Sequence, residues 1–440
     1  MYVYQELAAR AAAGKPVQVG LIGAGKFGSM FLSQVPTTPG LEVHTIADLN
    51  PDGAKNACRT VGWPEDLIEK TRFVDDAMAM MQAGGIDVIV EATGNPVVGL
   101  THAREAIRNG LHIVMVNVEA DVLAGPLLAE EARRAGVVYS MAYGDQPALT
   151  CELVEWARAT GFEVVAAGKG TKYLPEYHTS TPDTVWDHYG LTPEAAAAAG
   201  MNSQMFNSFL DGTKSALEMA AIANGTGLTP PPDGLKFPAA SMGDLAHVLR
   251  PQSEGGQLHH KGQVEVVSSL ELDGRQVFND LRWGVYVVIE AANDYAASCF
   301  RQYGMNTDAT GRYSAMFKPF HLIGLELNIS ILSAALLNKP TGATDGFRGD
   351  VVATAKRDLK AGEMLDGEGG FTVWGKLYPA ETSLALGGLP IGLAHHVKLT
   401  TNVALHQPIR WRDVDIDATL DAVKIRRQME AQFKVPEAAE

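Results

Sequence analysis

The sequence predicts an α/β protein in which a doubly wound parallel sheet comes first, an α+β domain follows, and a small β-rich domain ends the chain. Through residues 1–147, short apolar runs alternate with helical segments, and parallel strands need long crossovers of this kind. Over 148–342, helices and strands mix without that alternation, and glycines break 343–440 into short strand-like runs. A chain of 440 residues is long enough for these three domains.

The first domain opens with a short predicted helix and then a strand at 17–24, VQVGLIGA. This nearly continuous apolar run ending in glycine is typical of a buried parallel strand. The opening segment has no basic region followed by an apolar stretch, so it does not resemble a signal peptide. Further strands are expected at 41–48, 86–93, 111–120 and 137–143, with helices between them.

The second domain is expected to mix both kinds of element. Its alanine-rich segment PEAAAAAG has high helix propensity and predicts a short surface helix. The runs at 263–272 and 283–291 alternate or concentrate β-branched residues, which is typical of strands. The other expected elements are helices at 148–160 and 203–224 and a strand at 163–168.

Composition limits the classes of partner. Lys and Arg number 36 against 51 Asp and Glu, and the net charge of −15 disfavours nucleic acid and anionic membranes. The most apolar stretch, His321–Leu337, is interrupted by Glu326 and Asn328, so no run of about 18 apolar residues predicts a membrane span. The three cysteines form no CxxC pair, as expected of reduced thiols. We therefore expect a cytoplasmic protein that acts on a small molecule.

A glycine-rich motif lies between the first predicted strand and the first long helix. Gly23, Gly25 and Gly28 fit the pattern G-x-G-x-x-G, with Lys26 and Phe27 inside it. The first glycine permits a tight turn, the second lets the backbone approach a pyrophosphate, and the third lets helix and strand pack closely. The helix N-terminus then offers free N–H groups to the phosphates. The motif predicts a Rossmann domain that binds a nicotinamide dinucleotide.

The residues that follow the later strands bear on which dinucleotide binds. Asp48 ends the second strand 20 residues after Gly28. A carboxylate there hydrogen-bonds the ribose 2′-hydroxyl and repels the 2′-phosphate of NADP, so NAD is the expected cofactor. Alternatively, Asp48 caps the next helix and leaves the choice open. Thr93, Gly94 and Asn117 are expected near the nicotinamide, although each is also a common turn residue.

Hydride transfer needs an acid or base for the alcohol proton and a cation for the developing alkoxide. Lysine serves both needs when burial lowers its pKa. Lys169 lies between two glycines at the end of a predicted strand, where it is either close to a ligand or an ordinary loop lysine. Lys172 is a second candidate, for substrate binding.

Three charged residues are spaced three and four apart in the segment predicted to be helical over 203–224. Asp211, Lys214 and Glu218 would share one face of that helix. They are either a solvated salt-bridge ladder or a buried set, and the apolar residues around them favour burial. Because buried charges must be paired or used, we expect Lys169 and Lys214 to act on the substrate, with Asp211 and Glu218 orienting them.

Other polar residues are candidates for substrate binding. Glu119 and Asp145 follow the fourth and fifth strands, at the ligand side of such a sheet. They would bind substrate hydroxyls or a divalent metal, or else cap helices. Lys318 and His321, within KPFH, are expected to hold a carboxylate or phosphate.

Several short motifs follow the glycine-rich loop along the chain: EATG at 91–94, NVEAD at 117–121, GKG at 168–170, DGTKSALEMAAIAN at 211–224, KPFHL at 318–322 and KRDLKAGEMLD at 356–366. The order of these motifs resembles the homoserine dehydrogenase superfamily. It is most similar to its 1-deoxy-D-xylulose-5-phosphate reductoisomerase-like proteins, in which a SAF-type (β-clip) domain follows the catalytic domain. The resemblance implies an acid–base pair on the helix that contains Glu218, a C-terminal SAF domain and a homo-oligomer.

One departure from that family affects the expected function. The reductoisomerase-like enzymes reduce with NADPH and carry basic residues where this chain has Asp48-Leu49-Asn50. We therefore expect an NAD-dependent dehydrogenase, or an oxidoisomerase, acting on a small polyhydroxylated acid, ketose or sugar phosphate. One alternative is a true reductoisomerase-like enzyme of isoprenoid precursor synthesis. A second is a redox sensor that binds NAD(H) without turnover and signals through its SAF domain.

Overall fold

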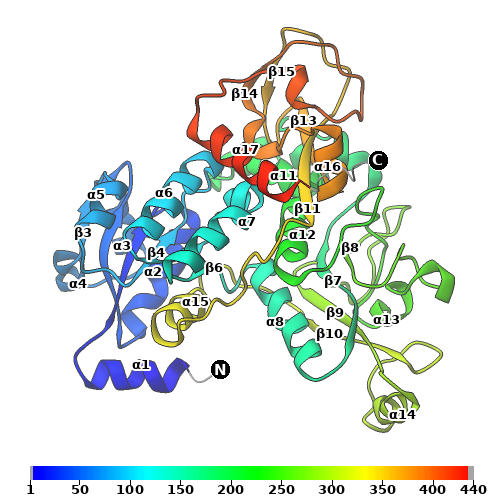
Figure 1. Cartoon of the computed structure of the whole chain (residues 1–440), viewed down its shortest axis with the longest axis horizontal. Helices are drawn as coiled ribbons and strands as arrows, with labels where there is room; N and C mark the ends of the chain where they lie inside the picture. The colour runs from blue at the N-terminus through cyan, green and yellow to red at the C-terminus, as the bar shows by residue number, and fades with distance from the viewer. Residues whose placement is uncertain (1–2, 435–440) are drawn as a thin grey trace. The chain divides into compact units, whose positions relative to one another are not determined.

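The computed structural model describes residues 3–434, which form two compact units. The first unit contains the chain up to Glu152 and the later segment His321–Asp345. The second contains Leu153–Phe320 and the chain from Gly346 onward. Figure 1 follows the chain through its elements in colour.

The first unit contains a six-stranded parallel sheet in the order β3-β2-β1-β4-β5-β6. The order reverses between β1 and β4, which makes this the point where a doubly wound sheet binds its ligand. The predicted fold class is confirmed. The strands are β1 (Val17–Ile22), β2 (Leu41–Ala47), β3 (Arg72–Val74), β4 (Val88–Glu91), β5 (His112–Met115) and β6 (Tyr139–Met141).

The helices of the first unit follow the predicted alternation with one difference. The run 111–120, expected as one strand, leaves the sheet after Met115, and α7 begins at Val118. The cause is Asn117, whose side chain accepts the N–H of Ala120 and so caps the new helix. The helices that begin in this unit are α1 (Val3–Ala12), α2 (Lys26–Gln34), α3 (Pro51–Thr60), α4 (Glu65–Lys70), α5 (Ala77–Gln82), α6 (Pro96–Arg108), α7 (Val118–Ala135), α8 (Gln146–Ala159) and α15 (Asn328–Leu332).

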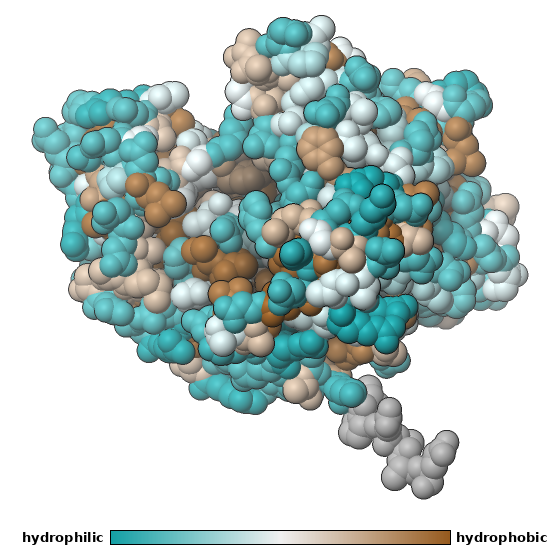
Figure 2. Space-filling model, turned by 90° about the horizontal axis from the view of Figure 1, so that it is seen from above, coloured by the Kyte–Doolittle hydropathy of each residue, from teal (hydrophilic) through white to brown (hydrophobic). Residues whose placement is uncertain are grey.

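The apolar stretch His321–Leu337 belongs to the core of the first unit, although it was expected in the second domain. Leu327, Ile331 and Leu332 are buried in the same cluster as the side chains of β1 and α2. Its apolar character therefore reflects packing against the Rossmann sheet. Among residues 3–434, no helix is both long and apolar enough to cross a bilayer. Figure 2 shows mainly hydrophilic side chains on the face it presents, in keeping with the acidic composition.

The second unit contains a mixed sheet in the order β10-β9-β7-β8. Strands β7 and β8 are parallel, and β9 is antiparallel to β7 and β10. This confirms the predicted α+β character. The elements up to residue 320 are β7 (Glu163–Thr171), β8 (Gln263–Ser268), β9 (Val285–Glu290), β10 (Tyr313–Lys318), α9 (Val185–Tyr189), α10 (Pro193–Ala198), α11 (Ser203–Leu210), α12 (Thr213–Thr226), α13 (Leu245–Val248) and α14 (Asp294–Gln302).

The single helix predicted over 203–224 is wrong, because the chain breaks into α11 and α12. Gly212 separates them with a φ of +90°, a left-handed conformation that glycine adopts without strain. Asp211 ends α11 and lies outside α12. It therefore cannot share a helical face with Lys214 and Glu218, as the spacing of the three residues suggested.

Helix α12 is buried around nearly its whole circumference. It contacts β7 and β8 of the mixed sheet and also β11 and β13 of the C-terminal region. The approach to β11 is close: a Cβ on Gly349 would lie 3.2 Å from the Ala220 backbone. The N–H of Gly375 in β13 donates to the Thr213 hydroxyl at 2.8 Å.

Small antiparallel sheets make up the C-terminal region, as predicted. This region lies within the second compact unit, whereas the sequence predicted a separate module, because α12 is apolar on the side that β11 and β13 cover. Its elements are β11 (Gly349–Ala355), β12 (Met364–Asp366), β13 (Val373–Pro379), α16 (Ala380–Leu386), β14 (His395–Leu399), β15 (Val414–Asp415) and α17 (Asp421–Phe433).

A buried ion pair attaches α17 to β11. The Arg426 guanidinium donates to both carboxylate oxygens of Asp350, at 2.6 and 3.1 Å, and neither residue is exposed to solvent. Ser383 donates to the same carboxylate at 2.5 Å. Removing one partner of such a pair leaves an uncompensated buried charge.

We predict that Arg426→Met lowers the free energy of unfolding by about 3–5 kcal/mol, the usual cost of breaking a buried pair from one side. Lys424→Met on the same helix is the control, because Lys424 is exposed and lies 3.7 Å from an exposed Asp421. Urea unfolding of both variants measures the difference. Equal midpoints would contradict a stabilising role for the Arg426–Asp350 pair.

Candidate functional site

The glycine-rich loop joins β1 to α2 at the switch point of the parallel sheet. Gly23 has a φ of +92°, and a Cβ there would lie 2.8 Å from the Ala92 carbonyl oxygen. Gly25 is the N-cap of α2, no side chain caps it, and a Cβ there would meet nothing within 4 Å. The first N–H groups of α2 thus open onto free space, which suits the pyrophosphate of a dinucleotide. Lys26 is exposed and Phe27 half-buried beside this opening.

Asp48 connects the end of β2 to the glycine-rich loop. Its carboxylate accepts the N–H of Ala24 at 2.9 Å and the N–H of Asn50 at 2.8 Å. The N-cap of α3 is Asn50, whose side chain accepts the N–H of Gly53, so Asp48 does not cap that helix. The half-buried Asp48 carboxylate keeps lone pairs for the ribose hydroxyls.

The loops after β4 and β5 also lie at the carboxyl edge of the sheet. Thr93 and Gly94 are exposed, and the Thr93 hydroxyl donates to Glu91 at 2.5 Å. Asn117 is buried, and its amide nitrogen donates to the Asn95 carbonyl at 2.9 Å. Because its oxygen also caps α7, Asn117 uses both ends of its side chain to hold two loops together.

Glu119 and Asp145 both lie in the first unit and are buried. Glu119 is in the first turn of α7, where a carboxylate interacts favourably with the helix dipole. Asp145 immediately precedes α8 and accepts the N–H of Gln146 at 2.9 Å. Within residues 3–434, no three His, Cys, Asp or Glu side chains gather in a way that could hold one metal ion.

A buried ion pair joins the mixed sheet of the second unit to α12. The ammonium of Lys169 on β7 contacts the carboxylate of Glu218, and both side chains are nearly inaccessible to solvent. Within residues 3–434, Glu218 is the one side-chain partner of this ammonium. The glycines on either side of Lys169 have a packing role: a Cβ on Gly168 or Gly170 would collide with backbone carbonyls.

A second buried ion pair was not anticipated from the sequence. Lys356, which directly follows β11, lies 2.7 Å from the Asp211 carboxylate and donates to the carbonyls of Ser180 and Gly370 at 2.8 Å each. All three N–H groups of its ammonium thus have partners within the protein. Asp211 also accepts the N–H of Thr213, which fixes the start of α12. Burial raises the pKa of Asp211, and the Lys356 charge opposes this rise.

The other predicted cations lie on different elements of the chain. Lys214 is half-exposed in the first turn of α12, and Lys318 ends β10 in the second unit, whereas His321 belongs to the first unit. The Lys172 ammonium donates to the His188 carbonyl, and burial lowers its pKa. The Lys172 side chain is thus hydrogen-bonded within the segment that follows β7.

His178 also adjoins Asp211 and was missed in the sequence. Its Nδ1 donates to the Asp211 carbonyl at 2.7 Å, and its Nε2 accepts the Tyr173 hydroxyl at 2.9 Å. Burial lowers the pKa of His178 to about 4, so the ring is neutral near pH 7. A lone histidine in a polar segment carries no spacing signal that would have identified it.

Two known families match successive parts of the chain. Residues 17–143 match the family described as oxidoreductase family, NAD-binding Rossmann fold. Residues 144–327 match the family described as oxidoreductase DRL, catalytic domain. The fold, the glycine-rich site and the first match together indicate an NAD(P)-binding Rossmann domain, and the second match indicates an oxidoreductase catalytic domain.

Similarity to solved structures is distant. 1-Deoxy-D-xylulose 5-phosphate reductoisomerase from Zymomonas mobilis, in complex with NADPH, is 20% identical over 47% of this chain and 57% of that chain, with a TM-score of 0.35. Myo-inositol dehydrogenase from Lactobacillus casei, in complex with NAD(H) and myo-inositol, is 17% identical over 39% and 50%, with a TM-score of 0.29. Homoserine dehydrogenase from S. aureus is 15% identical over 33% and 40%, with a TM-score of 0.23.

The chain spans about half the length of these solved structures. With TM-scores this low, none of the three bears on the substrate. A comparison with curated proteins gave no match.

Proposed function

We propose that the protein is an NAD-linked dehydrogenase that oxidises or reduces a hydroxyl carbon of a small polyhydroxylated acid, ketose or sugar phosphate. The observation that carries this proposal is the buried Lys169–Glu218 pair in the DRL catalytic domain. Burying a charged group costs desolvation free energy, and a single ion-pair partner does not offset all of it, so such a group is a candidate for binding a ligand. Lys169 has two N–H groups left for a substrate oxygen, whereas Lys356 has none.

Oxidation of an alcohol removes a hydride from its carbon and a proton from its hydroxyl. The dinucleotide, when bound, supplies the acceptor for the hydride. Lys169 accepts the hydroxyl proton in its neutral form, and its ammonium stabilises the alkoxide in the reverse direction. Glu218 holds the lysine in place from α12. A charge held in place in this way lowers the free energy of the transition state, because the site does not have to rearrange during the reaction.

The remaining candidates have supporting roles in this proposal. Lys214 is a second cation for the substrate, and Asp211 positions α12 through Thr213 and Lys356. Lys172 and Lys318 are further candidates for substrate binding within the second unit. For Glu119, Asp145 and His321 of the first unit, substrate binding stays a prediction from the sequence, as does a divalent metal held by Glu119 and Asp145. A coupled isomerisation, as in the reductoisomerase-like enzymes, is the second enzymatic candidate, and product analysis distinguishes it. The SAF-type assignment of 343–440 and a homo-oligomeric state remain proposals from the family resemblance.

The Asp48 carboxylate favours NAD over NADP. We predict that Asp48→Ser improves NADP affinity relative to NAD by about tenfold, because it removes a repulsion of about 1–2 kcal/mol between two anions. Asp52→Ser is the control, since Asp52 is an exposed carboxylate four residues further along. Titration of both dinucleotides against each variant measures the ratio. Tighter binding of NADP by the unmodified protein would overturn the choice of cofactor.

Lys169→Met tests the acid–base assignment. We predict a loss of about 10²-fold or more in kcat, the size expected for losing acid–base help. The matched control is Lys356→Met, which also leaves a buried carboxylate without its lysine. Both variants should melt at lower temperature, but Lys356→Met should keep near-normal kcat in the folded fraction. Turnover of sugar acids, ketoses and sugar phosphates is followed as NADH absorbance. Equal losses of kcat in the two variants would mean that Lys169 has only a structural role.

Lys214→Met tests the second cation. Lys214 is half-exposed, so the variant should retain its melting temperature and NAD affinity. We predict that its kcat falls by about 10²-fold, because a charge beside the reacting oxygen is lost from the transition state. A surface salt-bridge role predicts near-normal kcat instead, with a stability change of a few tenths of a kcal/mol.

A further inference from the structure

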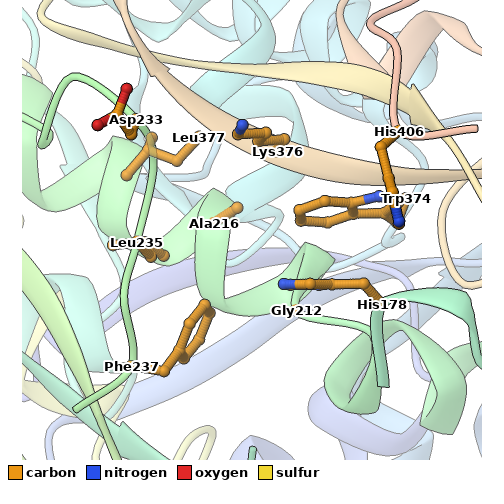
Figure 3. A pocket seen from close by; sticks show the side chains of 10 residues that line it. All are labelled: His178, Gly212, Ala216, Asp233, Leu235, Phe237, Trp374, Lys376, Leu377 and His406. Atoms are coloured by element: carbon orange, nitrogen blue, oxygen red, sulfur yellow. The ribbon is translucent and has the colours of Figure 1, made fainter. Parts of the chain in front are cut away.

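The second unit contains a cavity of about 230 Å³ that none of the roles above uses. It lies beside the first turns of α12 and is lined by residues of β13, of the loop before Phe237 and of the loop that contains His406. Figure 3 shows Leu235 and Phe237 across from Trp374 and His178. The lining residues are His178, Gly212, Ala216, Asp233, Leu235, Phe237, Trp374, Lys376, Leu377 and His406.

Two cationic groups on the cavity wall, the Lys376 ammonium and the His406 ring, lack hydrogen-bond partners in the described part of the chain. Trp374 is 8% exposed and presents its ring to the cavity, and its buried indole N–H has no hydrogen-bond partner there either. Within residues 3–434, the Lys376 ammonium forms no ion pair and lies 5.1 Å from the Tyr378 ring centre. The exposed His406 ring likewise has no hydrogen bond.

The walls of the cavity are rigid. His178 stacks on Trp374 with ring centres 3.8 Å apart, and both of its nitrogens are engaged by Tyr173 and Asp211. Phe237 stacks on Tyr173 at 3.9 Å. The buried Glu265 carboxylate accepts the N–H groups of Lys236 and Phe237, which holds Phe237 at its unusual φ of +51°. These contacts hold the aromatic wall of the cavity in place, whereas Lys376 is half-buried and His406 is exposed.

The cavity and the Lys169–Glu218 pair lie on different sides of α12. Ala216 faces the cavity, and Glu218 follows two residues later. Each residue of an α-helix turns by about 100°, so these two side chains point about 200° apart. Neither Lys169 nor Glu218 lines the cavity.

We propose that this cavity binds a small hydroxylated anion, a carboxylate or a phosphate ester, at a site separate from the hydride-transfer residues. Lys376 and His406 supply positive charge and hydrogen bonds to the anionic oxygens, and the Asp233 carboxylate accepts a hydroxyl. Leu235 and Phe237 cover the carbon chain. The volume is below the roughly 300 Å³ of ordinary ligand pockets, which limits the ligand to a few carbons. The proposal is independent of the proposed function, because the binding needs neither dinucleotide nor turnover.

Calorimetric titration of the full chain, without dinucleotide, tests the site with glycerate, glycerol 3-phosphate and neutral glycerol. We expect one or both anions to bind and glycerol not to bind, and the two anions distinguish a carboxylate from a phosphate ligand. Lys376→Met and His406→Asn should each weaken binding by about tenfold or more, the usual effect of losing a charge-assisted hydrogen bond. Asparagine tolerates the positive φ of His406, so this backbone should persist. The exposed Lys398→Met is the matched control and should bind normally.

The indole N–H of Trp374 provides a second readout that does not depend on enzyme activity. Its ¹⁵N-labelled NMR signal, assigned by its absence in Trp374→Phe, should shift when the anion binds. Absence of binding at tens of millimolar, or an unchanged affinity in Lys376→Met, would overturn the proposal. If Lys169→Met weakened binding as much as Lys376→Met does, the ligand would occupy the hydride-transfer site, and the separate site would be wrong.

Discussion

The second unit depends on one constraint: α12 is buried around nearly its whole circumference, so neighbouring elements must cover its apolar residues and pair its polar ones. The mixed sheet covers it through β7 and β8, and the C-terminal strands β11 and β13 cover it from another direction. A helix of this composition is stable only when neither layer is missing. The C-terminal region is therefore a structural part of the second unit, whatever further role it has.

The same burial dictates what charged residues on or beside α12 can do. A charge in this core must have a partner of opposite sign, and the structure supplies two such pairs. Lys356 gives all its hydrogen bonds to Asp211 and to two carbonyls, so it fastens the C-terminal strands to the start of α12. Lys169 keeps hydrogen-bonding capacity beyond Glu218, and the proposed acid–base role of Lys169 rests on this difference from Lys356.

The two units use different means to prepare a binding site. In the first unit, the proposed dinucleotide site consists mainly of backbone N–H groups at the start of α2. One side chain adds to them: the Asp48 carboxylate, which accepts a hydrogen bond from the glycine-rich loop. In the catalytic unit, side chains from distant segments are held by stacking and by buried hydrogen bonds, as His178 is held between Trp374, Tyr173 and the Asp211 carbonyl. The protein has a net charge of −15, yet two basic side chains, Lys376 and His406, line this cavity.

The sequence by itself determined the Rossmann sheet, because an apolar run, a glycine motif and the following helix are neighbours in the chain and their signal is local. It also predicted roles for Lys169, a lysine between two glycines at a strand end, and for Glu218, a charge among apolar residues; the structure pairs these two side chains. It could not indicate that Gly212 ends one helix and begins another, nor that Asp211 pairs with Lys356. Those features, and the meeting of His178 with Trp374 and Lys376, depend on which strands cover α12. Only tertiary packing decides that, since no spacing along the chain encodes contacts between segments so far apart.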